Sequence, residues 1–134
     1  MATKIFVNLP VKDLKKSMAF FTKLGYQFNM EFTNDDAACM VVSDDIFVML
    51  LIEPFFKTFT KKQLVDATKS TEVLIALSTD EKSGVDEMLD KALNAGGKEA
   101  REPQDLGFMY SRSFEDLDGH IWEMAWMNTG ADQG

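Results

Sequence analysis

Cysteine and histidine are almost absent from this chain of 134 residues, since each occurs only once, as Cys39 and His120. A single cysteine excludes a disulfide within the chain and suits a reducing compartment. It also excludes the cysteine and histidine clusters that hold structural zinc. Cys39 stands between Ala38 and Met40 in an apolar run, so we expect a small buried hydrophobic residue and not a nucleophile.

Long apolar runs and an excess of positive charge are lacking as well. No apolar stretch reaches the roughly 20 residues that a membrane-spanning helix needs, and the first residues lack the apolar run of a signal peptide. The net charge is −8, whereas nucleic-acid binding requires a basic face. We therefore expect a cytoplasmic protein with no nucleic-acid or membrane partner, whose negative field would favour a cationic small molecule.

Phenylalanine and methionine are abundant instead, with 11 and 9 residues. Both pack well in a core, and flexible methionine also suits an irregular apolar cavity. The length fits one domain. We therefore expect a single domain over residues 1–134, with a polar tail at residues 128–134 that frays.

The first half of the chain predicts a strand, a helix and three more strands. Alternating apolar residues indicate a strand over residues 4–9, which Pro10 ends. Asp13 is a suitable N-cap for an amphipathic helix over residues 14–24, and Gly25 follows the helix end. Short polar clusters separate three further strand candidates, at residues 27–32, 37–42 and 46–52.

The second half repeats this order about 70 residues later. It has a strand at residues 73–78, a helix at 84–95 that ends at Gly96-Gly97, and strands at 98–101, 109–114 and 120–127. The linking segment carries Pro54 and predicts a short helix near residues 61–67. The repeat gives module 1 over about residues 4–52, a connector over 53–71 and module 2 over about 72–127.

Two stretches resemble the ends of a known protein family. Residues 9–17, Leu-Pro-Val-Lys-Asp-Leu-Lys-Lys-Ser, with Phe20-Phe21 and Leu24-Gly25, resemble the opening of glyoxalase/bleomycin-resistance proteins. Residues 114–123, Phe-Glu-Asp-Leu-Asp-Gly-His-Ile-Trp-Glu, resemble their closing hairpin, although the family usually has proline where this chain has Leu117. The resemblance implies the vicinal-oxygen-chelate superfamily, an α+β fold of two tandem βαβββ modules. They would form a curled mixed sheet, a half-barrel cup with the helices outside.

The resemblance also implies a metal site, of which this chain keeps one residue. Metal-dependent members place ligands on the first and last strands of each module, and the matching positions here are Phe6, Leu50, Leu74 and Glu123. Only Glu123 has a side chain that binds metals. We therefore predict no metal ligand set and no cofactor, with a divalent metal bound only if other groups complete the Glu123 site.

The alternation of side chains along the last strand separates Glu123 from its neighbours. His120, Trp122 and Trp126 share one face, and Glu123 lies on the other. If Glu123 faces the cup, His120 is a structural residue of the turn at 116–119, and the two tryptophans are core residues.

The predicted surroundings of Glu123 are apolar, so a buried carboxylate there needs a compensating partner. A structural interpretation supplies one, through a salt bridge or hydrogen bond to Arg112 or Asn8. A functional interpretation makes Glu123 the anchor for a ligand's amine or hydroxyl, or a general base.

Other side chains of the cup follow from strand alternation. Asn8 lies on Phe6's face, and either Tyr110 with Arg112 or Ser111 with Ser113 points inward, because the two sets alternate. The predicted ligand-binding residues are Phe6, Asn8, Leu50, Leu74, Tyr110, Arg112 and Glu123.

Three functions remain open at this point. The likeness to bleomycin-resistance proteins implies a homodimer that binds a cationic or apolar small molecule, without metal, in an apolar cup anchored by Glu123. A glyoxalase-like lyase or isomerase would use Glu123 as catalytic base or residual metal ligand. A dimeric structural or interaction module would have its cavity closed by the large apolar side chains.

Overall fold

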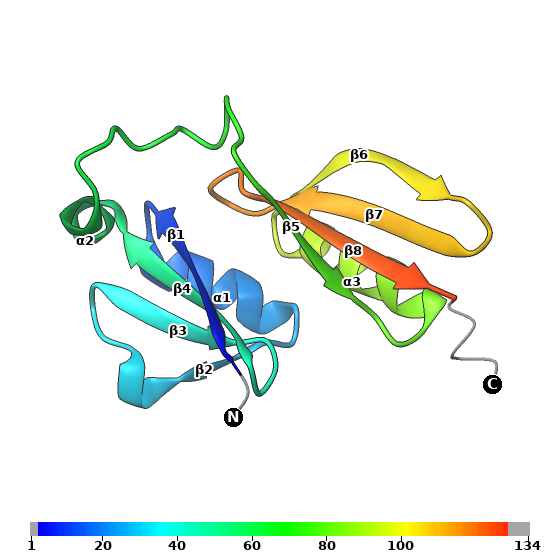
Figure 1. Cartoon of the computed structure of the whole chain (residues 1–134), viewed down its shortest axis with the longest axis horizontal. Coiled ribbons are helices and arrows are strands. Elements are labelled where there is room, and N and C mark those ends of the chain that lie inside the picture. Colours follow the sequence, from blue (N-terminus) through cyan, green and yellow to red (C-terminus); the bar gives the residue numbers. More distant parts are fainter. Residues whose placement is uncertain (1–2, 129–134) are drawn as a thin grey trace. The chain divides into compact units, whose positions relative to one another are not determined.

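The structure is a computed structural model that describes residues 3–128, so the rest of the predicted frayed tail lies outside the described residues. The chain forms two compact units, divided between Leu64 and Val65. Each unit has a four-stranded mixed sheet and a main helix (Figure 1). The predicted α+β fold of two βαβββ modules is therefore confirmed. A cup shared by both modules stays a prediction.

Module 1 has its helix between the first two strands of the chain. Its main elements are β1 (Ile5–Val11), α1 (Leu14–Lys23), β2 (Gln27–Asn29), β3 (Ala37–Val41) and β4 (Ile46–Ile52). The strand order is β1-β4-β3-β2, with β1 parallel to β4 and the other pairs antiparallel. The last strand of the module, β4, therefore pairs with the first, β1.

Helix α1 begins and ends where the sequence predicts. The Asp13 carboxylate accepts a hydrogen bond from the Lys16 amide at 3.1 Å, and Gly25 adopts a φ of 106° after the helix end. The helix buries Phe20 and Phe21. Core residues of the sheet lie on β1, β3 and β4: Leu9, Val11, Ala38, Met40, Val48 and Leu50. Cys39 is also buried, as predicted, and burial raises the pKa of its thiol.

Two predicted boundaries in module 1 are wrong. Pro10 does not end β1, because the strand continues to Val11 with Pro10 opposite Leu51; proline is tolerated here because β1 is an edge strand of its sheet. The strand predicted over residues 27–32 stops at Asn29. The Asn29 side chain accepts the Glu31 amide at 3.0 Å, and this local bond favours a 3-10 turn, η1 (Met30–Phe32).

The connector also differs from the prediction. Its helix is α2 (Glu53–Phe56), followed by the 3-10 turn η2 (Lys57–Phe59), and no helix forms at residues 61–67. Pro54 explains the earlier position, because proline in the first helical turn removes no helix hydrogen bond. Phe55 packs edge-on against Phe59 with ring centroids 5.2 Å apart.

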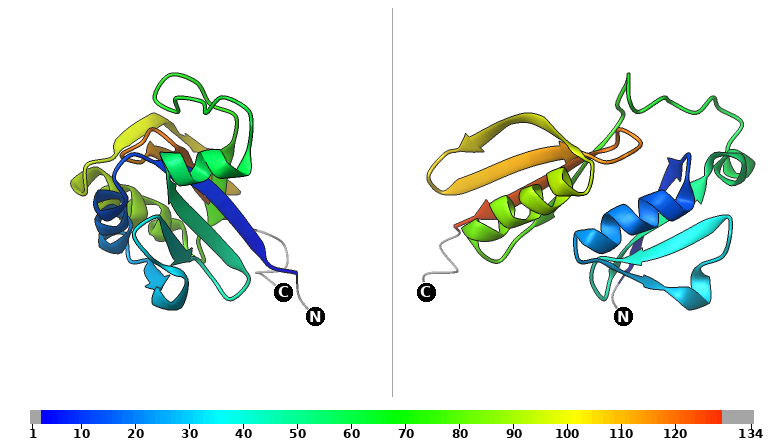
Figure 2. Two further views of the ribbon diagram at one scale, coloured as in Figure 1. Left: turned by 90° about the vertical axis from the view of Figure 1, so that its left-hand side faces the viewer. Right: turned by 180° about the vertical axis from the view of Figure 1, so that it is seen from behind.

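Module 2 repeats the plan, with longer second and third strands. It contains β5 (Leu74–Ser78), α3 (Lys82–Asn94), β6 (Lys98–Asp105), β7 (Met109–Glu115) and β8 (Ile121–Met127), in the sheet order β5-β8-β7-β6. Helix α3 lies along one face of this sheet (Figure 2). Val85, Leu89 and Ala92 are its buried residues. The largest departure from the prediction is β6, which runs four residues further.

The turn between β7 and β8 is organised by Asp116, which the sequence did not single out. Its carboxylate accepts the amides of Asp118 and His120 at 2.9 and 3.0 Å and the Trp122 indole N–H at 3.0 Å. Gly119 has a φ of 89°, and a Cβ there would lie 2.8 Å from the backbone of Ala67. His120 therefore belongs to a hydrogen-bonded turn, as predicted.

Candidate functional site

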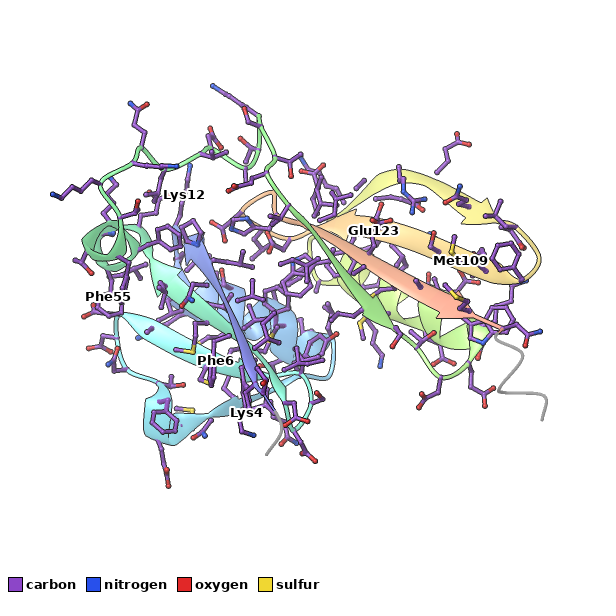
Figure 3. All side chains as sticks on the ribbon, in the orientation of Figure 1. Lys4, Phe6, Lys12, Phe55, Met109 and Glu123 are labelled. Carbon is purple, nitrogen blue, oxygen red and sulfur yellow. The ribbon has the colours of Figure 1, made fainter. Side chains whose placement is uncertain are left out.

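The two faces of the module 2 sheet have different surroundings. Trp122 and Met124 of β8 are buried on the face that α3 covers, and Trp122 stacks with Phe114. Glu123 alternates with them and lies on the other face, which we call the open face of module 2 (Figure 3). The predicted separation of Glu123 from the core tryptophan is confirmed.

Strand register shows which residues share the open face with Glu123. Ser113 and Ala76 pair with Glu123 on the two neighbouring strands. Leu74, one of the predicted ligand-binding residues, lies on the same face and is 55% exposed. Module 2 therefore brings Leu74 and Glu123 to one surface.

The same register settles the alternative at β7. Tyr110 and Arg112 lie on the α3 side, because both side chains hydrogen-bond to Asp86 of that helix, at 2.7 and 2.9 Å. Arg112 also binds Glu99 at 3.0 Å. Ser111 and Ser113 therefore face the Glu123 side, and the structure does not bring Tyr110 and Arg112 together with Glu123, as the predicted site required.

Asp86, Tyr110 and Arg112 form a hydrogen-bonded network on the α3 side of the sheet. Hydrogen bonds from Tyr110 and Arg112 lower the pKa of the Asp86 carboxyl, and the hydrogen bond to Asp86 raises the pKa of Tyr110. These groups satisfy one another between α3 and the sheet, so we interpret them as structural.

Glu123 has a partner that the sequence analysis missed. The Arg101 Nη2 atom donates to Glu123 Oε1 at 2.5 Å and to Ser111 Oγ at 3.0 Å, and Nη1 donates to the Glu102 carbonyl at 2.9 Å. The predicted partners were Arg112 and Asn8. Arg112 is on the other face, and the Asn8 amide donates to the Phe6 carbonyl at 3.3 Å. The prediction of a compensating partner is confirmed, but its identity was wrong.

An irregularity in β6 explains why Arg101 reaches Glu123. Glu99 pairs with Phe114 and Arg101 with Ser113, so β6 has one more residue than β7 over this interval. Without that bulge, residues 99 and 101 would lie on the same face. The bulge sends Glu99 to the α3 side and Arg101 to the open face. Small serine side chains on β7 let the arginine extend across that strand to β8.

Ser113 lies between the two charged residues in the sheet register. Ser113 is 1% exposed, and within residues 3–128 its Oγ is buried without a hydrogen-bond partner. The side chains of Arg101 and Glu123 are 37% and 21% exposed. The open face of module 2 therefore carries a neutral ion pair, two serine hydroxyls and the apolar side chain of Leu74.

Module 1 has a face of the same kind, which α1 does not cover. Phe6 is 52% exposed and stacks on Phe47 with ring centroids 4.9 Å apart, and Asn8 pairs with Met49 on this face. Leu50 does not belong to it. Leu50 pairs with Leu9 and is buried in the core, so it does not share the face of Phe6, where Met49 lies instead.

The residues present do not fit a divalent metal. Within residues 3–128, no three His, Cys, Asp or Glu side chains converge as a metal site would require. Glu123, the carboxylate that the resemblance keeps, forms an ion pair with Arg101 of the same chain.

Among the helices within residues 3–128, none is long and apolar enough to cross a membrane.

Comparisons with known proteins agree with this fold. A family model described as bleomycin resistance protein-like N-terminal matches residues 3–43. A hypothetical protein, SA1046 from S. aureus, is 28% identical, with 94% of this chain and 95% of that chain covered and a TM-score of 0.78. No curated protein sequence matches the chain.

Solved structures with lower identity share the architecture. A glyoxalase/bleomycin resistance protein/dioxygenase family enzyme from Burkholderia phytofirmans is 15% identical, with a TM-score of 0.77 over 94% of this chain and 99% of that one. The fosfomycin resistance protein FosX from Mesorhizobium loti is 16% identical, with a TM-score of 0.69 over 99% and 98%. The chain has the fold of the glyoxalase/bleomycin-resistance/dioxygenase superfamily.

Proposed function

We propose that this protein binds a small organic molecule on the open face of module 2, with Glu123 and its partner Arg101 as the polar anchor. The observation that carries the proposal is this ion pair at the centre of a sheet face that also exposes Leu74. Mostly apolar surroundings with a few polar groups that fix orientation are typical of ligand sites. The proposal includes binding without a metal.

We further propose that the protein forms a homodimer. The Phe6 and Phe47 rings offer apolar contact area for a ligand. Each sheet ends in exposed edge strands, β1 and β2 in module 1 and β5 and β6 in module 2, and pairing between subunits is one way to cover such edges. Light scattering of the purified protein should give twice the chain mass; a monomer would contradict the dimer.

A ligand screen tests the proposed function. Thermal shift with a panel of small aromatic and aliphatic compounds should reveal binders, and Glu123→Gln should weaken them at least tenfold, because Arg101 then loses the carboxylate that holds it in place. Glu87→Gln makes the same chemical change at an exposed position of α3 and should leave binding unchanged. Chemical-shift changes should concentrate at Leu74 and Glu123. If binders perturb only α3, or respond equally to both substitutions, the proposed site is wrong.

The single cysteine bears on the compartment in which the protein works. We place the protein in the cytoplasm because its one cysteine is buried and reduced. Fractionation of expressing cells would test this.

A further inference from the structure

We infer that Arg101 determines the specificity of the Glu123 site. Arg101 is the resident cation of Glu123, so the site excludes free cations, divalent metals included, and accepts ligands through oxygen acceptors such as a carboxylate or an amide carbonyl. This inference rests on the proposed function only for the position of the ligand. The role of Arg101 as counter-ion can be tested without any ligand.

The contacts of Arg101 fix its guanidinium from three strands. Acceptors on β6, β7 and β8 are the Glu102 carbonyl, the Ser111 hydroxyl and the Glu123 carboxylate. A guanidinium carries five N–H donors in a planar fork, and these three bonds leave Nε–H and one Nη1–H for a ligand. A cation that approached Glu123 would have to displace a group held at all three points, whereas an oxygen acceptor would add to it.

Ser113 gives a second, independent indication of a ligand. Its hydroxyl lies between Arg101 and Glu123 in the sheet register and is buried without a partner among residues 3–128. A buried polar atom of this kind costs free energy until a partner reaches it. A hydroxyl can donate to an oxygen acceptor, as the remaining N–H groups of Arg101 do, and it can also accept a hydrogen bond. The N–H groups that Arg101 leaves open can only donate, so they select an oxygen acceptor.

The apolar part of the ligand follows from the neighbours on the same face. Leu74 is exposed, and Ile121, its partner in the register, lies beside it. Benzoate, benzamide and benzylammonium share one ring and differ only in the polar group, so they are suitable probes. Benzoate or benzamide should bind most tightly, and the dissociation constant of benzylammonium should be at least fivefold higher.

Removal of the resident cation supplies the direct test. Arg101→Ala leaves space for a guanidinium ion beside Glu123. At 20 mM, guanidinium chloride should raise the Tm of this variant by about 1–3 °C relative to the same concentration of NaCl, as expected for a dissociation constant on the order of 10 mM. The wild type and the double variant Arg101→Ala/Glu123→Gln should show no such rise.

Further variants keep the test independent of folding. Arg101→Lys retains the charge and should not respond to guanidinium, and Arg101→Gln is a neutral replacement of similar length if the alanine variant does not fold. Arg101→Gln should also reverse the order of the three ring probes, with benzylammonium first.

The outcomes separate this inference from the proposed function. If the wild type gains as much from guanidinium as Arg101→Ala, if neither neutral variant gains, or if the wild type prefers benzylammonium, Arg101 does not have this role. If the guanidinium effect is as expected but no small molecule binds the wild type, the counter-ion role stands and the proposed function fails.

Discussion

The two modules build equivalent cores but different open faces. Both bury one side of a four-stranded sheet under a helix. On the other side, module 1 presents stacked rings, Phe6 on Phe47, while module 2 presents the ion pair of Arg101 and Glu123. The difference shows that a repeated fold can keep its packing in both copies and place the charged chemistry in one of them.

The largest effect is expected from Trp122→Ala in module 2. The substitution leaves a cavity beneath α3 and removes a hydrogen bond to buried Asp116. The loss should be about 3–5 kcal/mol of unfolding free energy. Because the chain forms two compact units, amide exchange should accelerate more in α3 than in α1, and Phe20→Ala should give the opposite pattern. Equal acceleration in both helices after each substitution would show that the modules unfold together.

Two glycines with positive φ give a matched pair across the modules. Gly25 has no atom within 4 Å of a Cβ position, whereas Gly119 would place its Cβ 2.8 Å from the Ala67 backbone. Gly25→Ala should cost about 1 kcal/mol for the backbone conformation. Gly119→Ala should cost about 3 kcal/mol, because the steric conflict adds to it. Urea denaturation measures both; similar losses would mean that the connector does not pack on this turn.

The buried Asp116 carboxyl should make the stability of module 2 depend on pH, and comparison with Asp116→Asn isolates its contribution. Burial raises the pKa of Asp116, with the nearby His120 opposing the shift. The folded state then binds a proton more tightly than the unfolded state. The contribution of Asp116 to stability therefore falls as pH rises from the ordinary pKa, 3.8, to the raised value. The unfolding free energy of wild type minus that of Asp116→Asn should decrease over this interval. If this difference increased with pH, the pKa of Asp116 would be lowered and not raised by folding.

Helix capping should change the free energy of unfolding by a smaller amount, and it differs between the two modules. Asp13 caps α1 through its side chain, but Glu81 at the same position of α3 makes no such bond. Asp13→Ala should cost about 1 kcal/mol, and Glu81→Asp should gain up to about 1 kcal/mol by adding the cap. Thermal unfolding measures both. A loss of stability in Glu81→Asp would mean that Glu81 has another role.

The smallest stability effect is expected at the open face itself. Arg101 and Glu123 are partly exposed, so Glu123→Gln and Arg101→Gln should each cost less than about 1 kcal/mol. A double-mutant cycle in urea measures their coupling. A coupling well above that value would indicate that the pair holds the sheet together, and its function would then be structural.

Sequence periodicity and turn residues were sufficient for most of the fold. The order of elements, the Asp13 cap, the glycines that end both helices and the burial of Trp122 all follow from local patterns. The errors occurred where local bonding competes with alternation. Asn29 turns the chain into a 3-10 segment by a side-chain hydrogen bond, and Pro10 is tolerated because its strand lies at an edge.

The site was less accessible to prediction because it depends on register between strands. Glu123 and Leu74 were identified, but Leu50 was assigned to the wrong face, and Tyr110 with Arg112 was chosen over Ser111 with Ser113. Arg101 was missed because a bulge reverses the face on which it lies. The sequence feature that could have pointed to Arg101 is an arginine in an extended segment that precedes a strand with two small serines. Alternation alone does not locate a bulge.

Nitrogen-15 NMR of the arginine guanidinium groups tests most directly whether Glu123 holds Arg101. The wild type should show separate Arg101 Nη signals, because bonds to Glu123, Ser111 and the Glu102 carbonyl restrict rotation of the group. In Glu123→Gln these signals should merge, while those of Arg112, on the other side of the sheet, stay unchanged. Merged Arg101 signals already in the wild type would contradict the account, because the open face of module 2 would then have no fixed ion pair.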